Sequence, residues 1–214
     1  MTSSVPDVPP AMQERSKRTL ERIYRAGTEV LEKQGPSAVT IANVAAAAGV
    51  STGSIYRRFG SKDQLLTVIQ HEFIEEFKAE MASRLNGEHL QPDASLNDVV
   101  RVAVQGFAGT FETRQRLLRE LMLVSTENPA VFEVGSRGAI ECGAMFRELL
   151  LGVADKITRP HPEQAIDYAY RMLYSMCAFR ALFGENVEST RPAPWPALID
   201  EMTTALCAYF TADS

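Results

Sequence analysis

The sequence predicts an all-α protein of about nine helices, with a small N-terminal three-helix domain and a larger C-terminal helical domain. Three observations support this prediction. Apolar residues recur at the three-to-four spacing of amphipathic helices from residue 16 almost to the end of the chain. Glycine and proline interrupt these stretches at the places where helices would stop. A sustained alternation of apolar and polar residues, which would indicate strands, occurs nowhere.

The N-terminal third contains the clearest helix boundaries. Residues 1–15 include three prolines, and we expect them to form a disordered arm. Thr40 and Ser51 are good N-caps for two short helices, and Gly49 suits the left-handed position between them. Ser61 and Gln64 form a capping box for a long helix with an apolar stripe. The helices expected in this part span about 16–34, 41–48, 52–59 and 62–81.

A second domain is predicted after this point. The segment 86–94 is polar, contains glycine and proline, and is typical of a linker. We place the following helices near 95–112, 114–125, 129–153, 162–183 and 195–211. The expected domains are therefore residues 16–66, with a helix-turn-helix at about 40–59, and residues 67–214.

Composition and charge limit the possible functions. Residues 1–70 carry nine Lys/Arg and six Asp/Glu, and the remaining chain carries thirteen and twenty-one. The N-terminal part is therefore basic, although the net charge of the whole chain is −5. Neither an apolar run of membrane-spanning length nor the apolar core of a signal peptide occurs, which predicts a cytoplasmic protein without membrane contact. The three cysteines are far apart, and we expect buried reduced thiols.

The helix predicted at 52–59 has two chemically different faces. On a helical wheel Ile55 and Phe59 point toward a core, and Gly53, Ser54 and Arg57 point the opposite way. Small residues allow a helix to approach another molecule closely, and guanidinium groups suit phosphates and base edges. This pattern favours DNA binding. The alternative is that the short alanine-rich helix before it simply packs closely and the arginines decorate a solvated surface.

A family resemblance strengthens the first interpretation. Residues 40–66, TIANVAAAAGVSTGSIYRRFGSKDQLL, resemble the DNA-binding core of the tetracycline-repressor (TetR) family of bacterial regulators. The family pattern falls without a gap on Thr40, Ile41-Ala42, Ala48-Gly49-Val50-Ser51, Gly53, Ile55, Tyr56, Phe59 and Lys62. The resemblance covers about residues 16–66, and beyond that only the length and the helical layout are similar.

The resemblance implies a role for each matching residue. Thr40, Tyr56 and Lys62 are expected at phosphates, the outer residues of the third helix at or beside the bases, and Arg58 nearer the rim. The expected DNA-binding residues are Thr40, Ser51, Thr52, Gly53, Ser54, Tyr56, Arg57, Arg58 and Lys62. The resemblance also implies a homodimer on a near-palindromic operator in double-stranded DNA, and repression that ends when a small molecule binds the C-terminal domain.

Two sets of C-terminal residues are assigned to these further roles. Methionines and aromatic residues on successive helices are typical of an adaptable apolar pocket for a mostly apolar effector. They are Phe107, Phe111, Leu118, Met122, Phe132, Met145, Phe146, Met172, Met176 and Phe179. Stripes on the last two helices predict a four-helix dimer interface. They comprise Ile166, Ala169, Tyr170, Leu173, Cys177, Leu198, Met202, Ala205, Leu206 and Tyr209.

Enzymatic chemistry is not predicted. His71-Glu72 lacks a second histidine at position 75, where a zinc-protease motif would need it, and neither a phosphate loop nor a nucleophile elbow occurs. We therefore expect no catalytic residue, no metal and no cofactor. Two alternatives to a ligand-released repressor remain open: an activator or ligand-independent regulator of the same fold, and a helical protein-interaction module without DNA binding.

Overall fold

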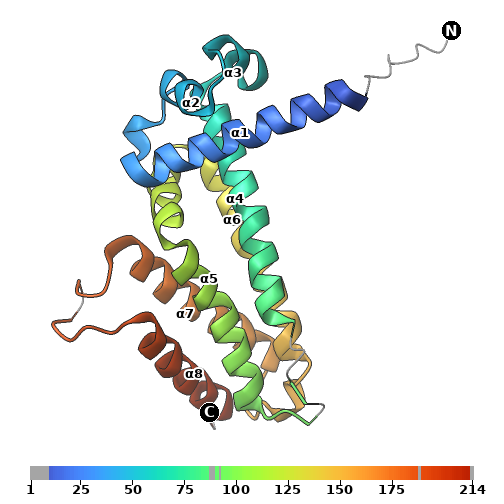
Figure 1. The fold of residues 1–214 in the computed structure, drawn as a ribbon. Helices are drawn as coiled ribbons and strands as arrows, with labels where there is room; N and C mark the ends of the chain where they lie inside the picture. The colour runs from blue at the N-terminus through green and yellow to red at the C-terminus, as the bar shows by residue number, and fades with distance from the viewer. Residues whose placement is uncertain (1–9, 87–89, 92, 188, 213–214) are drawn as a thin grey trace. The chain divides into compact units, whose positions relative to one another are not determined.

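The computed structural model describes residues 10–86, 90–91, 93–187 and 189–212 (Figure 1). The chain divides into two compact units, which we call the N-terminal unit (Met1–Glu72) and the C-terminal unit (Phe73–Ser214). The described residues form eight α-helices and two short 3-10 helices and contain no strand. The predicted all-α class is therefore confirmed. None of the described helices is both long and apolar enough to cross a membrane.

The N-terminal unit is built on the three-helix arrangement that the sequence predicts. Its elements are α1 (Pro10–Gln34), the 3-10 helix η1 (Pro36–Ala38), α2 (Ile41–Ala48), α3 (Thr52–Phe59) and the first part of α4 (Lys62–Leu85). Its core is apolar and closely packed, because Gly27 on α1 leaves room for the side chain of Ile69 on α4. The fully buried side chains at its centre are Ile23, Leu31, Val39, Val44, Ile55 and Ile69.

The start of α1 corrects one expectation. The helix begins at Pro10, so the prediction of a disordered arm is wrong for residues 10–15, while residues 1–9 lie outside the described part. Proline is well suited to the first helical position, because it has no N–H and its φ angle is already helical. The residues that follow it, AMQERSKR, are mostly good helix formers.

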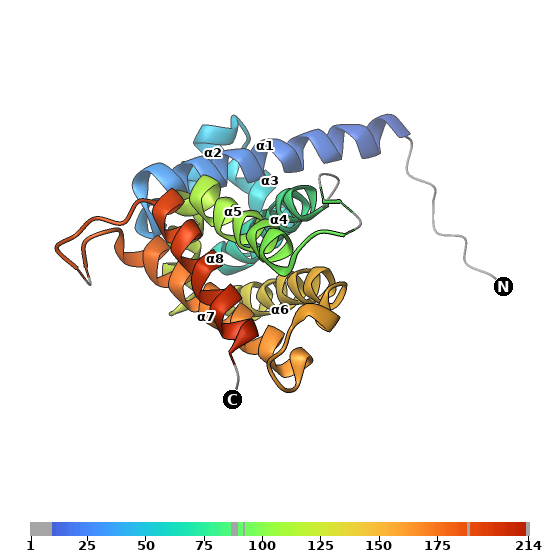
Figure 2. The same ribbon diagram turned by 90° about the horizontal axis from the view of Figure 1, so that it is seen from below.

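The C-terminal unit is a bundle around α5 (Leu96–Ser125). It also contains the rest of α4, α6 (Pro129–Leu151), the 3-10 helix η2 (Ala154–Lys156), α7 (Pro162–Phe183) and α8 (Trp195–Thr211). Helix α5 packs against α6, α7 and α8, and the two views agree that α7 and α8 lie on the side of α5 away from α4 (Figures 1 and 2). Rings from four helices meet at its centre, with neighbouring centroids 4.8–6.5 Å apart. They are Phe77, Phe107, Phe111, Phe146, Tyr170 and Tyr174.

Helix α5 replaces two predicted helices. We expected a break between residues 112 and 114, and the structure shows one continuous helix there. The segment contains neither glycine nor proline, and apolar residues on both sides of it, Phe111 and Leu118, are buried as parts of one stripe. A capping box of Ser95 and Asp98 starts the helix as its sequence requires. Within the predicted linker 86–94, residues 87–89 and 92 lie outside the described residues.

Candidate nucleic-acid interface and the outer face of α7

The turn between α2 and α3 is fixed by local hydrogen bonds. Thr40 caps α2, because its hydroxyl accepts from the Asn43 amide at 3.1 Å. Gly49 takes the left-handed conformation (φ 62°) that ends α2. The Arg22 guanidinium on α1 then donates to the carbonyl oxygens of Ala48 (2.5 Å) and Gly49 (3.0 Å). Sequence patterns had not assigned this role to Arg22, because the contact joins residues that are far apart in the chain.

Helix α3 starts at Ser51, as predicted. The Ser51 hydroxyl accepts from the Ser54 amide at 3.2 Å, and the two hydroxyl groups lie 2.8 Å apart. Ile55 and Phe59 are buried, so the opposite face of the helix is turned outward. The predicted wheel of α3 therefore corresponds to the structure.

The outer face of α3 consists of Thr52, Gly53, Tyr56 and Arg57. All four are exposed, with Tyr56 56% accessible. Among the described residues, none makes a hydrogen bond or an ion pair with the Arg57 or Tyr56 side chain. A Cβ atom added at Gly53 would approach only the Ser51 hydroxyl, at 4.0 Å, so the fold does not require a glycine there. This face thus offers a free guanidinium, a free phenol and a bare backbone to a partner.

Two of the predicted DNA-binding side chains also make hydrogen bonds within the N-terminal unit. The Arg58 guanidinium donates to the carbonyl oxygen of Ser16 at 2.9 Å and also to the Ser16 hydroxyl. These bonds tie the last turn of α3 to α1. The Lys62 ammonium donates to the carbonyl oxygen of Pro36 at 3.3 Å, which holds η1 against the start of α4. Both residues therefore have a structural partner that the motif alone does not reveal.

Of the predicted effector residues, Met172 and Met176 line the cavity between α7 and α8, and the others do not. Phe107, Phe111, Leu118 and Phe146 are buried in the core of the C-terminal unit. Their helical spacing predicts an apolar face, and in the structure this face packs against neighbouring helices. Met122 and Met145 are half-buried on α5 and α6. The other four are exposed: Phe132 on α6, and Met172, Met176 and Phe179 on α7.

The predicted dimer residues also divide by burial. Ile166, Ala169, Leu173 and Cys177 are fully buried within the C-terminal unit, so in this structure they expose no surface to a second chain. Tyr170 belongs to the aromatic centre and donates to the carbonyl oxygen of Ala139 at 2.5 Å. On α8, Met202 and Leu206 are buried, Ala205 is exposed, and Leu198 and Tyr209 are half-buried. The predicted stripe on α7 has the expected helical period, and in the structure it faces the core of the C-terminal unit.

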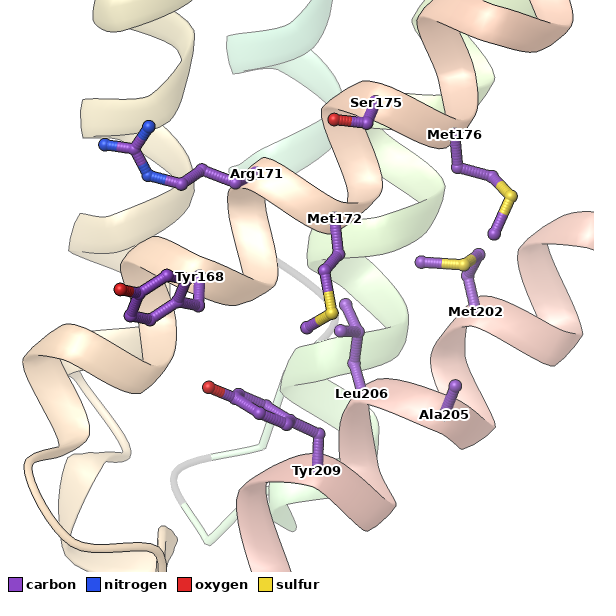
Figure 3. A pocket seen from close by; sticks show the side chains of 9 residues that line it. All are labelled: Tyr168, Arg171, Met172, Ser175, Met176, Met202, Ala205, Leu206 and Tyr209. Atoms are coloured by element: carbon purple, nitrogen blue, oxygen red, sulfur yellow. The ribbon is translucent and has the colours of Figure 1, made fainter.

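The outer face of α7 is apolar and exposed. It consists of Tyr168, Met172, Met176, Phe179 and Phe183, which follow one another at helical spacing and are 42–60% accessible. Between α7 and α8 lies an open cavity of about 750 Å³ (Figure 3). Its lining residues are Tyr168, Arg171, Met172, Ser175, Met176, Met202, Ala205, Leu206 and Tyr209.

The described residues contain no metal-binding cluster of three or more His, Cys, Asp or Glu side chains. The free cysteines Cys142 and Cys177 are buried, and desolvation raises the pKa of each thiol to about 12. At neutral pH they are therefore protonated and poor nucleophiles.

Comparisons with known proteins agree with this arrangement. The sequence pattern of the family described as "Bacterial regulatory proteins, tetR family" matches residues 23–69, which include α2, α3 and the start of α4. An HTH-type transcriptional repressor of Mycobacterium tuberculosis is 40% identical over 50 residues. That match covers 23% of this chain and 27% of the repressor, so it spans about a quarter of the relative's length.

Solved structures resemble the chain over most of its length. A TetR-family transcriptional regulator from Mesorhizobium loti superposes with a TM-score of 0.71 at 16% identity, covering 91% of this chain and 96% of that one. Salmonella enterica GusR gives 0.65 at 19% identity, covering 90% and 95%. At identities this low, the structural likeness establishes the fold alone. The match to residues 23–69 adds a relationship in sequence for that segment. Residues 23–69 therefore match the TetR family of bacterial regulatory proteins by sequence, and the fold of the chain is that of the solved TetR-family regulators.

Proposed function

We propose that the protein is a DNA-binding transcriptional regulator that represses by binding a near-palindromic operator as a homodimer and is released by a small molecule. The outer face of α3 carries this proposal. A helix that presents small residues, a free phenol and a free guanidinium is suited to the DNA major groove, whose base edges and flanking phosphates those groups can bind.

We assign the contacts on DNA as follows. Thr52, Gly53, Ser54 and Arg57 lie at or beside base edges, with Arg57 as the candidate for a bidentate bond to guanine. Thr40, Tyr56 and Lys62 contact phosphates. Ser51 is exposed at the N-terminus of α3, where it lies beside the DNA. Arg58 acts through Ser16 by fixing α1 against α3, so we assign it a positioning role and not a base contact.

The outer face of α7 supports the homodimer. An exposed apolar row of five large residues is unusual for a surface that stays in water, and rows of this kind mark interaction sites. Ala205 and Tyr209 on α8 extend it across the cavity between the two helices (Figure 3). In a symmetric dimer the same patch meets itself, so α7 and α8 of two copies would form a four-helix interface.

Helix α4 offers a route for release. It is one continuous helix whose first residue is Lys62 and whose last turns belong to the C-terminal unit. There Glu80 accepts hydrogen bonds from Arg114 (2.7 Å), Thr113 (2.6 Å) and Arg84 (2.9 Å). Burial alone would raise the pKa of Glu80, but these hydrogen bonds outweigh it and lower the pKa to about 2. The carboxylate stays charged and holds α4 to α5.

Release requires that the effector bind better to the state that does not bind DNA. A coupling of about 1–3 kcal/mol would weaken DNA binding about 5–150-fold, and operator DNA would weaken effector binding by the same factor. A genuine effector that binds equally well with and without operator DNA would leave the DNA-binding proposal intact and refute the switch.

DNA binding itself is tested by titrating the full chain into fluorescently labelled duplex DNA at low salt and following anisotropy. We expect binding that weakens steeply with salt, because Lys and Arg replace counterions on phosphates. Arg137→Ala is the matched control, since Arg137 is an exposed arginine on α6 paired only with Glu133 among the described residues. If the native chain does not bind duplex DNA even at low salt, the helical interaction module is the better description. If it binds and raises transcription in a reporter assay, it is an activator.

A further inference from the structure

The C-terminal unit contains a largely buried guanidinium group whose Nη1 atom has no hydrogen-bond partner among the described residues. Arg180, in the last turn of α7, is only 4% accessible. Its Nη1 atom is buried and donates to no described protein atom, and none of the ion pairs among the described residues includes its guanidinium. Buried charges are normally paired or fully hydrogen-bonded, because desolvating them is costly.

A second guanidinium group binds at the same end of α7. Arg119 on α5 reaches the same end of α7 by donating to the carbonyl oxygen of Leu182 at 3.1 Å. The carboxylate next to Arg119, that of Glu120, is already paired with it at 2.5 Å. The Glu120 carboxylate therefore pairs with Arg119 and not with Arg180.

Arg180 also lies beside a second feature that favours anions. Its guanidinium is 5.9 Å from the centroid of the Trp195 ring, and Trp195 is the first residue of the 17-residue helix α8. At the start of α8 the amides of Trp195 and Ala197 have no acceptor within the helix, Pro196 has no N–H, and the helix dipole is positive there. Pro194, at the N-cap position, makes no side-chain capping bond. Trp195 is held in place, because its indole N–H donates to Gln115 at 3.0 Å.

Packing alone does not explain an arginine at this position. A methionine side chain would fill a similar volume against the Trp195 ring and avoid burying a charge. The cation–π contact with Trp195 is weaker than the attraction to a carboxylate, which guanidinium groups bind through two parallel hydrogen bonds. Arg180 thus has the properties of a preorganised receptor for an anion.

We propose that Arg180 and the N-terminus of α8 form a binding site for the carboxylate of a small organic acid, with the Trp195 ring as the apolar wall beside it. The anion site itself does not depend on the proposed function. Only the identification of its ligand as the effector rests on that proposal. The bound group would be a carboxylate attached to an apolar or aromatic body.

The chain provides its own reporter for this site. Trp195 is the only tryptophan in the sequence, so its fluorescence reports on the surroundings of Arg180 and nowhere else. Benzoate and benzamide are suitable probes, because they have nearly the same shape and differ in charge. The full chain is titrated with each probe in the absence of DNA, and both the Trp195 emission and the melting temperature are recorded.

We expect benzoate to change the Trp195 emission saturably and to raise the melting temperature, and benzamide to bind at least about tenfold more weakly. Arg180→Met should weaken benzoate binding at least about tenfold and, without any probe, melt at the same temperature as the native chain or higher. Arg137→Met, on α6, should titrate like the native chain.

Three results would overturn the proposal. They are the absence of a saturable benzoate response, equal binding of benzoate by Arg180→Met and the native chain, and a lower melting temperature of unliganded Arg180→Met, which would indicate a purely structural arginine. The outcome is independent of DNA binding. If benzoate binds through Arg180 but leaves DNA affinity unchanged, the anion site stands and the release mechanism fails.

Discussion

The outer faces of α3 and α7 are both exposed, but their chemistry is opposite. On α3 the exposed residues are small, polar or cationic, and Arg57 has no partner among the described residues. On α7 they are large and apolar, from Tyr168 to Phe183. The folded unit needs neither face for its own core, because Ile55 and Phe59 on α3, and Leu173 on α7, already supply the buried side. The chemistry of an exposed face that the core does not require indicates the kind of partner it binds. For α3 that partner is a negatively charged groove, and for α7 it is a second apolar surface.

The largest effect should come from a charge placed on the α7 face. Met176→Glu puts a carboxylate in the middle of the apolar row, so burying it against a second copy becomes costly. We expect a monomer by sedimentation and, because two linked half-site contacts become one, about 10²–10⁴-fold weaker binding to a palindromic site. Ile140→Glu is the control: Ile140 is exposed on α6, outside the α7 row. A Met176→Glu protein that remains dimeric would refute the interface.

A smaller effect, confined to DNA binding, is expected on α3. Gly53→Leu adds a bulky side chain at a position where a Cβ meets no close neighbour, and leucine is a better helix former than glycine. The free energy of unfolding should therefore stay constant or rise by up to about 1 kcal/mol. Affinity for the operator should nevertheless fall, by about tenfold or more, because the side chain keeps α3 out of the groove. Unchanged affinity, measured by anisotropy, would show that Gly53 does not face DNA.

Arg58 should behave differently from Arg57. Arg58→Ala removes the bonds to Ser16, so we expect a loss of about 0.5–1 kcal/mol in the free energy of unfolding, measured in urea. The preferred DNA sequence should remain the same, because Arg58 acts through α1. A changed base preference in Arg58→Ala, with unchanged stability, would make Arg58 a base contact.

Lys62 should give the smallest change. Lys62→Ala should weaken binding to all DNA sequences alike and reduce the salt dependence of binding by about one counterion. Comparing log affinity against log salt for the variant and the native chain measures this. An unchanged slope would mean that Lys62 serves only to hold Pro36.

Local chemistry explains which features the sequence predicts well. The caps at Thr40 and Ser51 and the left-handed Gly49 depend on residues within one or two turns, so they could be read from the chain and are confirmed. The partners of Arg58 and Arg22 lie 42 and 26 residues away, and no local pattern indicates them. The start of α1 at Pro10 was missed although its signals are local, because the three prolines of residues 1–15 were interpreted as a sign of disorder.

In the C-terminal unit, periodicity predicts which face of a helix is apolar, but it does not predict whether another helix covers that face. Phe107 and Phe179 have the same side chain and similar helical surroundings, yet Phe107 is 1% accessible and Phe179 is 44% accessible. The predicted effector set therefore mixed core residues with residues of the α7 face. Arg180 gave no signal at all, because its significance depends on the partners that it lacks.

The central claim, that the outer face of α3 reads DNA sequence, is tested most directly by selecting duplexes from a random pool with the native chain and with Arg57→Ala. We predict that the native chain selects an inverted repeat with half-sites about 34–36 Å apart, or somewhat more if two dimers share a site. Arg57→Ala should bind it about 1–3 kcal/mol more weakly and lose its preference at one position of each half-site. Selection of the same sequences by both proteins would contradict the claim, as would a selected site without two-fold symmetry.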